Sequence, residues 1–167
     1  MMSNQNSIVS STTGATFPTP AADCKTRNAI YVATCRLCKK QYSGKTTTQI
    51  RTRICGHRCH VYDLLFDEES DTAALVEHLV LEHGFMMRYP GCDDNVDRNL
   101  LSPQLFNSSF YFTVVEISPS NLDDAERRWV DKLVCLRPFG INKEKPGGVS
   151  DSMSNMCRRS LRFLSQR

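Results

Sequence analysis

The sequence lacks the segments that would place a chain in a membrane or outside the cell. It has no run of about 18 apolar residues, the length that a transmembrane helix needs. Residues 1–23 have neither the basic start nor the apolar centre of a secretory signal peptide. These absences argue against a membrane-spanning or secreted protein. We therefore expect an intracellular protein, of the nucleus or cytosol, without a membrane partner.

Charge is missing from the beginning of the chain. No charged residue precedes Asp23, and residues 1–23 are rich in Ser, Thr, Asn, Ala and Pro. Such a composition predicts a disordered leader. A sequence of 167 residues with 40% hydrophobic content suits one compact domain plus tails. We expect this domain over residues 24–147, followed by a basic C-terminal tail over residues 148–167.

Strand and helix signals follow one another in an order that predicts an α+β fold. Thr46 and Gln49 form a capping-box pattern, Asp71 and Gly84 can cap the two ends of a second helix, and Asn121 can cap a third. We expect strands over residues 28–35, 40–44 and 110–117 and helices over residues 47–60, 71–84 and 121–135, with no pattern over residues 85–107. The order β-β-α-α-β-α predicts a small antiparallel or mixed three-stranded sheet flanked by helices.

Acidic residues are absent from residues 36–60, which contain seven Lys or Arg side chains. Residues 157–167 form a second basic stretch without a carboxylate. Phosphate is the natural partner of such clusters, so we expect the chain to bind DNA. The alternative is that these charges only solvate a surface. The residues that we expect to contact DNA are Lys39, Lys40, Lys45, Arg51 and Arg58.

Without a secretory signal, the eight cysteines lack the context in which disulfides form. They are better explained as thiols or metal ligands. Cys35 and Cys38 have the spacing of a zinc half-site, which His78 and His83 can complete. Two side chains five residues apart on one helix diverge by about 140°, so His83 must lie at the end of its helix to reach the same ion.

Two alternatives to this zinc site remain open at the level of sequence. Cys55 and Cys59 lie four residues apart on the first helix and could complete a four-cysteine site instead. The cysteines could also be small buried apolar residues. The remaining cysteines, which we expect to be plain thiols, are Cys24, Cys92, Cys135 and Cys157.

One carboxylate falls on the apolar face of the third helix. Glu126 shares a helical stripe with Trp129, Val130 and Leu133, so it must face the sheet. An unpaired buried carboxylate costs several kcal/mol. We therefore expect Glu126 to have a partner, either a basic side chain or a metal ion.

Two short motifs resemble a known family. Residues 29–31, Ala-Ile-Tyr, and residues 42–44, Tyr-Ser-Gly, look like the paired signatures of GIY-YIG nucleases. Arg53 and His57 match the arginine and histidine of the family's helix, Glu126 its metal-binding glutamate and Asn142 its late asparagine. Residues 126–133 and 138–142 look like the version found in Penelope-like retroelements. Ala29 and Ser43 depart from the usual residues of the two signatures.

The resemblance implies a GIY-YIG-like fold and a metal-dependent endonuclease that cuts a DNA phosphodiester. It implies that Glu126 binds Mg²⁺ or Mn²⁺, that Arg53 neutralises the phosphate, and that a tyrosine, Tyr31 foremost, orients or deprotonates the attacking water. A tyrosine can act as a base near neutral pH only where cations lower its pKa. The implied catalytic residues are Tyr31, Tyr42, Arg53, His57, Glu126 and Asn142.

The resemblance also implies partners and alternatives. Penelope-like nucleases accompany a reverse transcriptase, which we expect on the same or another chain, and they resemble this one in their Cys and His residues. The competing hypothesis is a catalytically inactive, zinc-stabilised module that only binds nucleic acid. A zinc-dependent protein-interaction domain is a third hypothesis, but it leaves the matched tyrosines, Arg53 and Glu126 unexplained.

Overall fold

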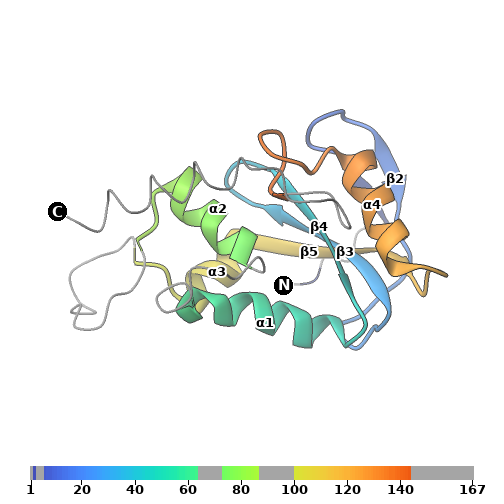
Figure 1. The fold of residues 1–167 in the computed structure, drawn as a ribbon, viewed down its shortest axis with the longest axis horizontal. Coiled ribbons are helices and arrows are strands. Elements are labelled where there is room, and N and C mark those ends of the chain that lie inside the picture. The colour runs from blue at the N-terminus through green and yellow to red at the C-terminus, as the bar shows by residue number, and fades with distance from the viewer. Residues whose placement is uncertain (1, 3–5, 64–72, 87–99, 144–167) are drawn as a thin grey trace.

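The computed structural model describes residue 2 and residues 6–63, 73–86 and 100–143 (Figure 1). A small antiparallel sheet with strand order β4-β3-β5 lies between helices. The expected α+β class with a three-stranded sheet is confirmed, and the sheet is antiparallel throughout. The basic tail and the acidic linking loop before the second helix lie outside the described residues.

The central strand is β3, Ala29–Cys35, whose seven residues are all buried. It pairs on one side with β4, Gln41–Thr46, and on the other with β5, Phe110–Ile117. β-Branched and aromatic residues in β3 and β5 suit a strand that is covered on both faces. Pairing of β3 with β4 places Tyr31 directly opposite Gly44, and this register positions the candidate site.

Alternate residues of β3 belong to two separate cores. Tyr31 and its neighbours at i±2 pack with α1, Ile50–Asp63, with α2, Ala74–His83, and with α3, Pro103–Ser109. Ile30 and Val32 face α4, Leu122–Leu133, on the opposite face of the sheet. The sheet is therefore covered on both faces, as Figure 1 shows.

The helix ends agree with the sequence at two positions. The Asn121 side chain accepts hydrogen bonds from the backbone N–H groups of Asp123 and Asp124 and so caps α4. Gly84 adopts a left-handed conformation and ends α2. No helix in the described part of the chain is long and apolar enough to cross a membrane.

The start of the first helix was predicted wrongly. α1 begins at Ile50, three residues later than expected, because the Thr46 hydroxyl bonds within the turn to Thr48 instead of capping a helix. Its first N–H groups are satisfied by distant backbone carbonyls: Ile50 donates to Thr26 and Arg51 donates to Cys24. These contacts are tertiary, so no local sequence pattern could show them.

The prediction that residues 1–23 form a disordered leader is wrong for a large part of that segment. β1, Ser7–Val9, and β2, Thr16–Pro18, form a hairpin. The Phe17 ring lies edge-on to Trp129 of α4 with 5.7 Å between centroids. The Ser10 hydroxyl donates to the Leu133 carbonyl. Burial against α4 compensates for a composition that by itself predicts disorder.

A second element without a sequence pattern is α3, which begins inside the segment 85–107 and continues to Ser109. Ser102 accepts a hydrogen bond from the Leu105 backbone N–H, and Pro103 occupies the first turn. These are strong N-terminal signals. The helix is only seven residues long, so it offers no periodicity to support them.

Substituting Ile8 tests the packing of the β1–β2 hairpin. Ile8 is buried in the core beneath α4, so Ile8→Ala should lower the free energy of unfolding by roughly 2–5 kcal/mol in denaturant titrations. Val9→Ala is the matched control: Val9 is half exposed, and its loss should stay within about 0.5 kcal/mol. Equal, negligible effects of both would show that the hairpin does not pack.

Candidate functional site

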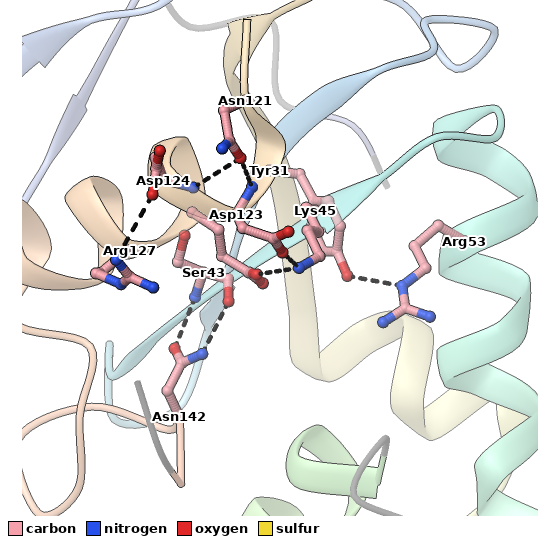
Figure 2. A network of polar contacts seen from close by, with 10 residues as sticks. Tyr31, Ser43, Lys45, Arg53, Asn121, Asp123, Asp124, Arg127 and Asn142 are labelled. Carbon is pink, nitrogen blue, oxygen red and sulfur yellow. Dashed lines mark hydrogen bonds and ion pairs between the residues drawn. The ribbon is translucent and has the colours of Figure 1, made fainter. Parts of the chain in front are cut away.

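The site is built around one buried hydroxyl. Tyr31 is fully buried between the sheet and α1. Its Oη lies 2.6 Å from Nε2 of His57 and accepts a hydrogen bond of 3.1 Å from Nε of Arg53. Figure 2 shows Arg53 reaching Tyr31 from the neighbouring helix. The tautomer of His57 decides whether the Tyr31 hydroxyl or the His57 ring donates the shorter bond: a neutral ring protonated at Nδ1 leaves Nε2 free to accept the phenolic hydrogen.

His57 and Arg53 can both reach Tyr31 because they lie four residues apart on α1. The Tyr42 ring is the second aromatic wall: it lies edge-on to His57 at 5.7 Å and tilted to Tyr31 at 6.4 Å, centroid to centroid. Four of the residues expected from sequence therefore form one cluster. Tyr31 and His57 are buried in it, whereas Arg53 and Tyr42 are partly exposed and form its outer side.

Gly44 makes room for this cluster. A Cβ atom at Gly44 would lie 2.6 Å from Oη of Tyr31 and 2.8 Å from Cε1 of Tyr42. Such distances are far below ordinary van der Waals contact. The glycine of the second signature is therefore required because the tyrosine hydroxyl crosses the strand where a side chain would stand.

The pKa values of the two tyrosines differ from our expectation. Burial raises the pKa of Tyr31 well above its usual value, and although the Arg53 charge lowers it, burial prevails. Burial also raises the pKa of Tyr42. Both phenols are therefore neutral at neutral pH, so the expected lowering of the pKa by cations is wrong for the protein by itself. Any proton that Tyr31 accepts must be matched by one that it passes on.

Glu126 lies on the inner face of α4 and its side chain is only 11% exposed. Oε2 of Glu126 is 3.2 Å from Nζ of Lys45, which projects from the edge strand β4. Burial raises the pKa of the Glu126 carboxyl, and Lys45 opposes this effect. Glu126 therefore has the basic side chain of Lys45 as a partner, which is one of the two kinds of partner that we expected.

Sequence reasoning missed one residue at this position. Asp123 lies one helical turn before Glu126 and also contacts Nζ of Lys45 (Figure 2). Its spacing of three residues from Glu126 was a visible signal, since residues at i and i+3 share a helix face. Arg53 and Glu126 also act on each other: the Arg53 charge lowers the pKa of the Glu126 carboxyl. The polar groups of α1, β4 and α4 are therefore electrostatically connected.

The Asn142 side chain is bonded to the edge strand. Its Nδ2 donates to the Ser43 carbonyl at 2.8 Å and its Oδ1 accepts from the Ser43 N–H at 2.9 Å. Both ends of the amide are therefore bonded to the backbone of β4, as Figure 2 shows. These contacts brace β4, and the catalytic role expected of Asn142 stays a prediction. The Ser43 hydroxyl is buried and has no hydrogen-bond partner among the described residues, so this departure from the family signature carries an energetic cost.

A second cluster contains the four predicted metal ligands, Cys35, Cys38, His78 and His83, whose ligand atoms all lie within 4.8 Å of one another. The closest sulfur–nitrogen pairs are 3.3 and 3.4 Å apart, and the two Nε2 atoms are 3.3 Å apart. In a tetrahedral zinc site, bonds of about 2.3 and 2.0–2.1 Å would place sulfur and nitrogen about 3.6 Å apart and two nitrogens about 3.3 Å apart. The cluster could therefore hold a metal ion.

Local backbone structure prepares this cluster. Cys35 is the last residue of β3, and Lys39 adopts a left-handed conformation in the turn that follows. Burial raises the pKa of the Cys35 thiol, and hydrogen bonds from the backbone N–H groups of Cys38 and Leu37 partly oppose this. His83 is the last residue of α2, as the angular argument required. Burial lowers the pKa of His78 to about 4, so at neutral pH it is a neutral imidazole, the form that binds metals.

The rival ligand pair lies elsewhere in the fold. Cys55 accepts a hydrogen bond from Arg58 and lines a cavity of about 230 Å³ beside α1. Cys24 and Arg51 line the same cavity. In the described part of the chain, Cys35 and Cys38 come together with the two histidines. Cys55 and Cys59 do not belong to this group.

The five residues expected to bind DNA occupy three places. Lys39 and Lys40 lie in the turn of the cysteine pair, where Lys40 forms an ion pair with Glu82. Lys45 lies at the edge strand with the Glu126 carboxylate. Arg51 and Arg58 lie on α1 and line the cavity described above. Lys45 is thus already committed to carboxylates, whereas the Arg51 side chain donates to the neutral Gln49 side chain.

Metal content tests the Cys/His cluster. The chain should bind one equivalent of Zn²⁺, and Cys38→Ser should abolish tight binding because it removes one of four ligands. Elemental analysis after dialysis and the thiolate charge-transfer absorption of the Co²⁺ form measure this. Cys55→Ser, which alters a thiol outside the cluster, should bind metal as the wild type does. Loss of metal in Cys55→Ser alone would instead favour the rival set.

Adding one methyl group at Gly44 tests the close approach of Tyr31. Gly44→Ala should lower the free energy of unfolding by about 1–3 kcal/mol, since the new Cβ displaces a fully buried ring. The control is Gly56→Ala in α1, where a Cβ meets nothing within 4 Å. That variant should gain up to about 1 kcal/mol from helix propensity. Tolerance of alanine at both positions would contradict the described packing.

Comparison with known proteins adds no relative. No protein-family model, no curated protein and no solved structure matches the chain. The resemblance of its motifs to GIY-YIG nucleases therefore stays a prediction, and the geometry of its own residues carries the functional argument.

Proposed function

We propose that this chain is a metal-dependent endonuclease of the GIY-YIG type that hydrolyses a DNA phosphodiester, nicking one strand. The observation that carries the proposal is the Tyr31 hydroxyl, buried and held between His57 and Arg53. A phenylalanine would fill the core without the cost of burying a hydroxyl. Polar groups held in this way by titratable partners are typical of functional sites.

Glu126 fits the role of a ligand for Mg²⁺ or Mn²⁺. It is a nearly buried carboxylate, and such a group needs a cation nearby. Mg²⁺ is commonly bound through one or two carboxylates, with water and substrate phosphate as the other ligands, so a single glutamate suffices. When bound, the ion would polarise the phosphate and stabilise charge on the leaving oxygen.

The proton and the phosphate are handled by the residues of the buried cluster. The Tyr31 oxygen orients the attacking water and accepts its proton while its own hydrogen passes to Nε2 of His57. This coupled transfer avoids a free phenolate, which the raised pKa of Tyr31 makes costly. Arg53 uses Nε for Tyr31, and its remaining donors are suited to the oxygens of the phosphate.

The other expected roles follow from position. A structural Zn²⁺ in the Cys/His cluster would fasten the β3–β4 turn to the end of α2. Arg51 and Arg58 on α1, with the lysines of the cysteine turn, would hold the DNA backbone through phosphate contacts that carry little sequence information. We further propose a Penelope-like origin, action in the nucleus or cytosol, and a reverse transcriptase as the partner activity.

Two observations favour the second candidate, an inactive nucleic-acid-binding module. Lys45 already neutralises Glu126, so the site is electrostatically satisfied without a divalent cation. The buried Ser43 hydroxyl also departs from a well-packed signature. Both candidates share the fold and the zinc cluster, so only a measurement of strand cleavage separates them.

Nicking of supercoiled plasmid distinguishes the two candidates. With Mg²⁺ or Mn²⁺, the zinc-loaded wild type should relax the plasmid, whereas Glu126→Ala and Tyr31→Phe should lose at least about 100-fold in rate, since each removes a group that acts in the reaction. Agarose-gel time courses measure the rate of the first cut.

Asp124→Asn is the matched control for the loss of a carboxylate on α4. Asp124 is half exposed and forms an ion pair with Arg127, away from Lys45, so this variant should cleave at the wild-type rate. A folded, zinc-loaded wild type that binds plasmid without relaxing it would overturn the nuclease proposal in favour of the binding module.

A further inference from the structure

One ammonium group lies between two carboxylates at the edge of the site. Nζ of Lys45 contacts Oδ1 of Asp123 (Figure 2) and Oε2 of Glu126, and these two carboxylates are one helical turn apart on α4. The two partners differ in environment: the Asp123 side chain is 64% exposed and that of Glu126 is 11% exposed. The same cation therefore has one partner in water and one in the protein interior.

The arrangement creates a competition at Glu126. The Lys45 ammonium is positively charged, and so is any divalent cation that binds the Glu126 carboxylate. The two repel each other, so they cannot both lie close to this one buried carboxylate. The long, flexible lysine stem allows the ammonium to move. Asp123 offers it a partner one turn away, at a position where most of its hydration is kept.

We propose that Lys45 is the resident counter-ion of Glu126 and that Asp123 retains the Lys45 ammonium when a divalent cation takes its place. Asp123 is then a positioning residue that sets the cation affinity through Lys45, without ligating the ion itself. The inference rests on the proposed role of Glu126 as the ligand. It names two residues that determine how readily the site is loaded with metal.

The size of the effect follows from how weak partly exposed ion pairs are. Such pairs stabilise by up to about 1 kcal/mol. Mn²⁺ can bind only to those molecules in which Lys45 has left Glu126, so the apparent affinity for Mn²⁺ is reduced in proportion to that fraction. Lys45→Met should therefore tighten the binding of Mn²⁺ by up to about fivefold, the factor that corresponds to about 1 kcal/mol. Asp123→Asn should weaken it by a similar factor, because Lys45 is then left to Glu126 alone.

The test is a double-mutant cycle on the binding of Mn²⁺ to the full, zinc-loaded chain without DNA. Free Mn²⁺ is measured by electron paramagnetic resonance for the wild type, Lys45→Met, Asp123→Asn and the double variant. Glu126→Gln identifies the binding that belongs to this site. Arg127→Met is the control for charge alone, since it removes a cation that lies on the same helix and forms an ion pair with Asp124.

The expected result is that Asp123→Asn weakens binding in the wild type and has no effect in Lys45→Met, while Arg127→Met tightens binding less than Lys45→Met does. Equal weakening in both backgrounds would show that Asp123 acts directly on the ion and would overturn the inference. So would equal effects of Arg127→Met and Lys45→Met. If Lys45→Met loses its zinc, Lys45→Gln replaces it in the cycle.

Failure of the proposed function looks different in the same experiment. If Glu126→Gln binds Mn²⁺ as the wild type does, Glu126 is not the ligand, and the proposed metal site falls together with the inference. If Glu126→Gln abolishes binding but the cycle shows no coupling between Lys45 and Asp123, the metal site stands and only the inference is overturned.

Discussion

The antiparallel pairing that sets Tyr31 opposite Gly44 positions both side-chain clusters of this fold. It lets a phenolic hydroxyl lie against the backbone of the neighbouring strand, where α1 supplies His57 and Arg53 as its partners. In the same hairpin, the turn between the strands carries the cysteine pair and β4 carries Lys45. A shift of one residue would reverse the face of every side chain in β4 and separate both clusters.

Polar groups in this small domain are buried in pairs and triads. In each of them a hydrogen bond or an ion pair compensates for the free energy that is lost when the group leaves water. Tyr31 is held by two side chains, Glu126 by an ammonium, and the Ser43 backbone by both ends of the Asn142 amide. Since an unsatisfied buried polar group costs about 1–3 kcal/mol, these contacts define how β4 sits between α1 and α4. Residues 141–142 thereby occupy part of the free edge of β4.

Much of the fold follows from local patterns. The sheet strands, the Asn121 cap and the Gly84 stop are short-range signals, and the structure agrees with them. The β1–β2 hairpin and the start of α1 could not be predicted, because both depend on contacts across the chain: Phe17 on Trp129, and the Thr26 carbonyl on the Ile50 N–H. A composition poor in charge and periodicity hides such elements.

Local sequence patterns were enough to identify the candidate residues of both clusters. They comprise two tyrosines in the paired motifs, an arginine and a histidine four residues apart, a carboxylate on the apolar face of a helix, and four side chains with the spacing of metal ligands. Tertiary structure decided what they do. Burial raised the pKa of Tyr31 instead of letting cations lower it, Asn142 became a brace for β4, and Asp123 entered the site through Lys45. The physical reason is that hydrogen-bond partners, desolvation and charge at short range depend on distances between elements far apart in sequence, which no local pattern encodes.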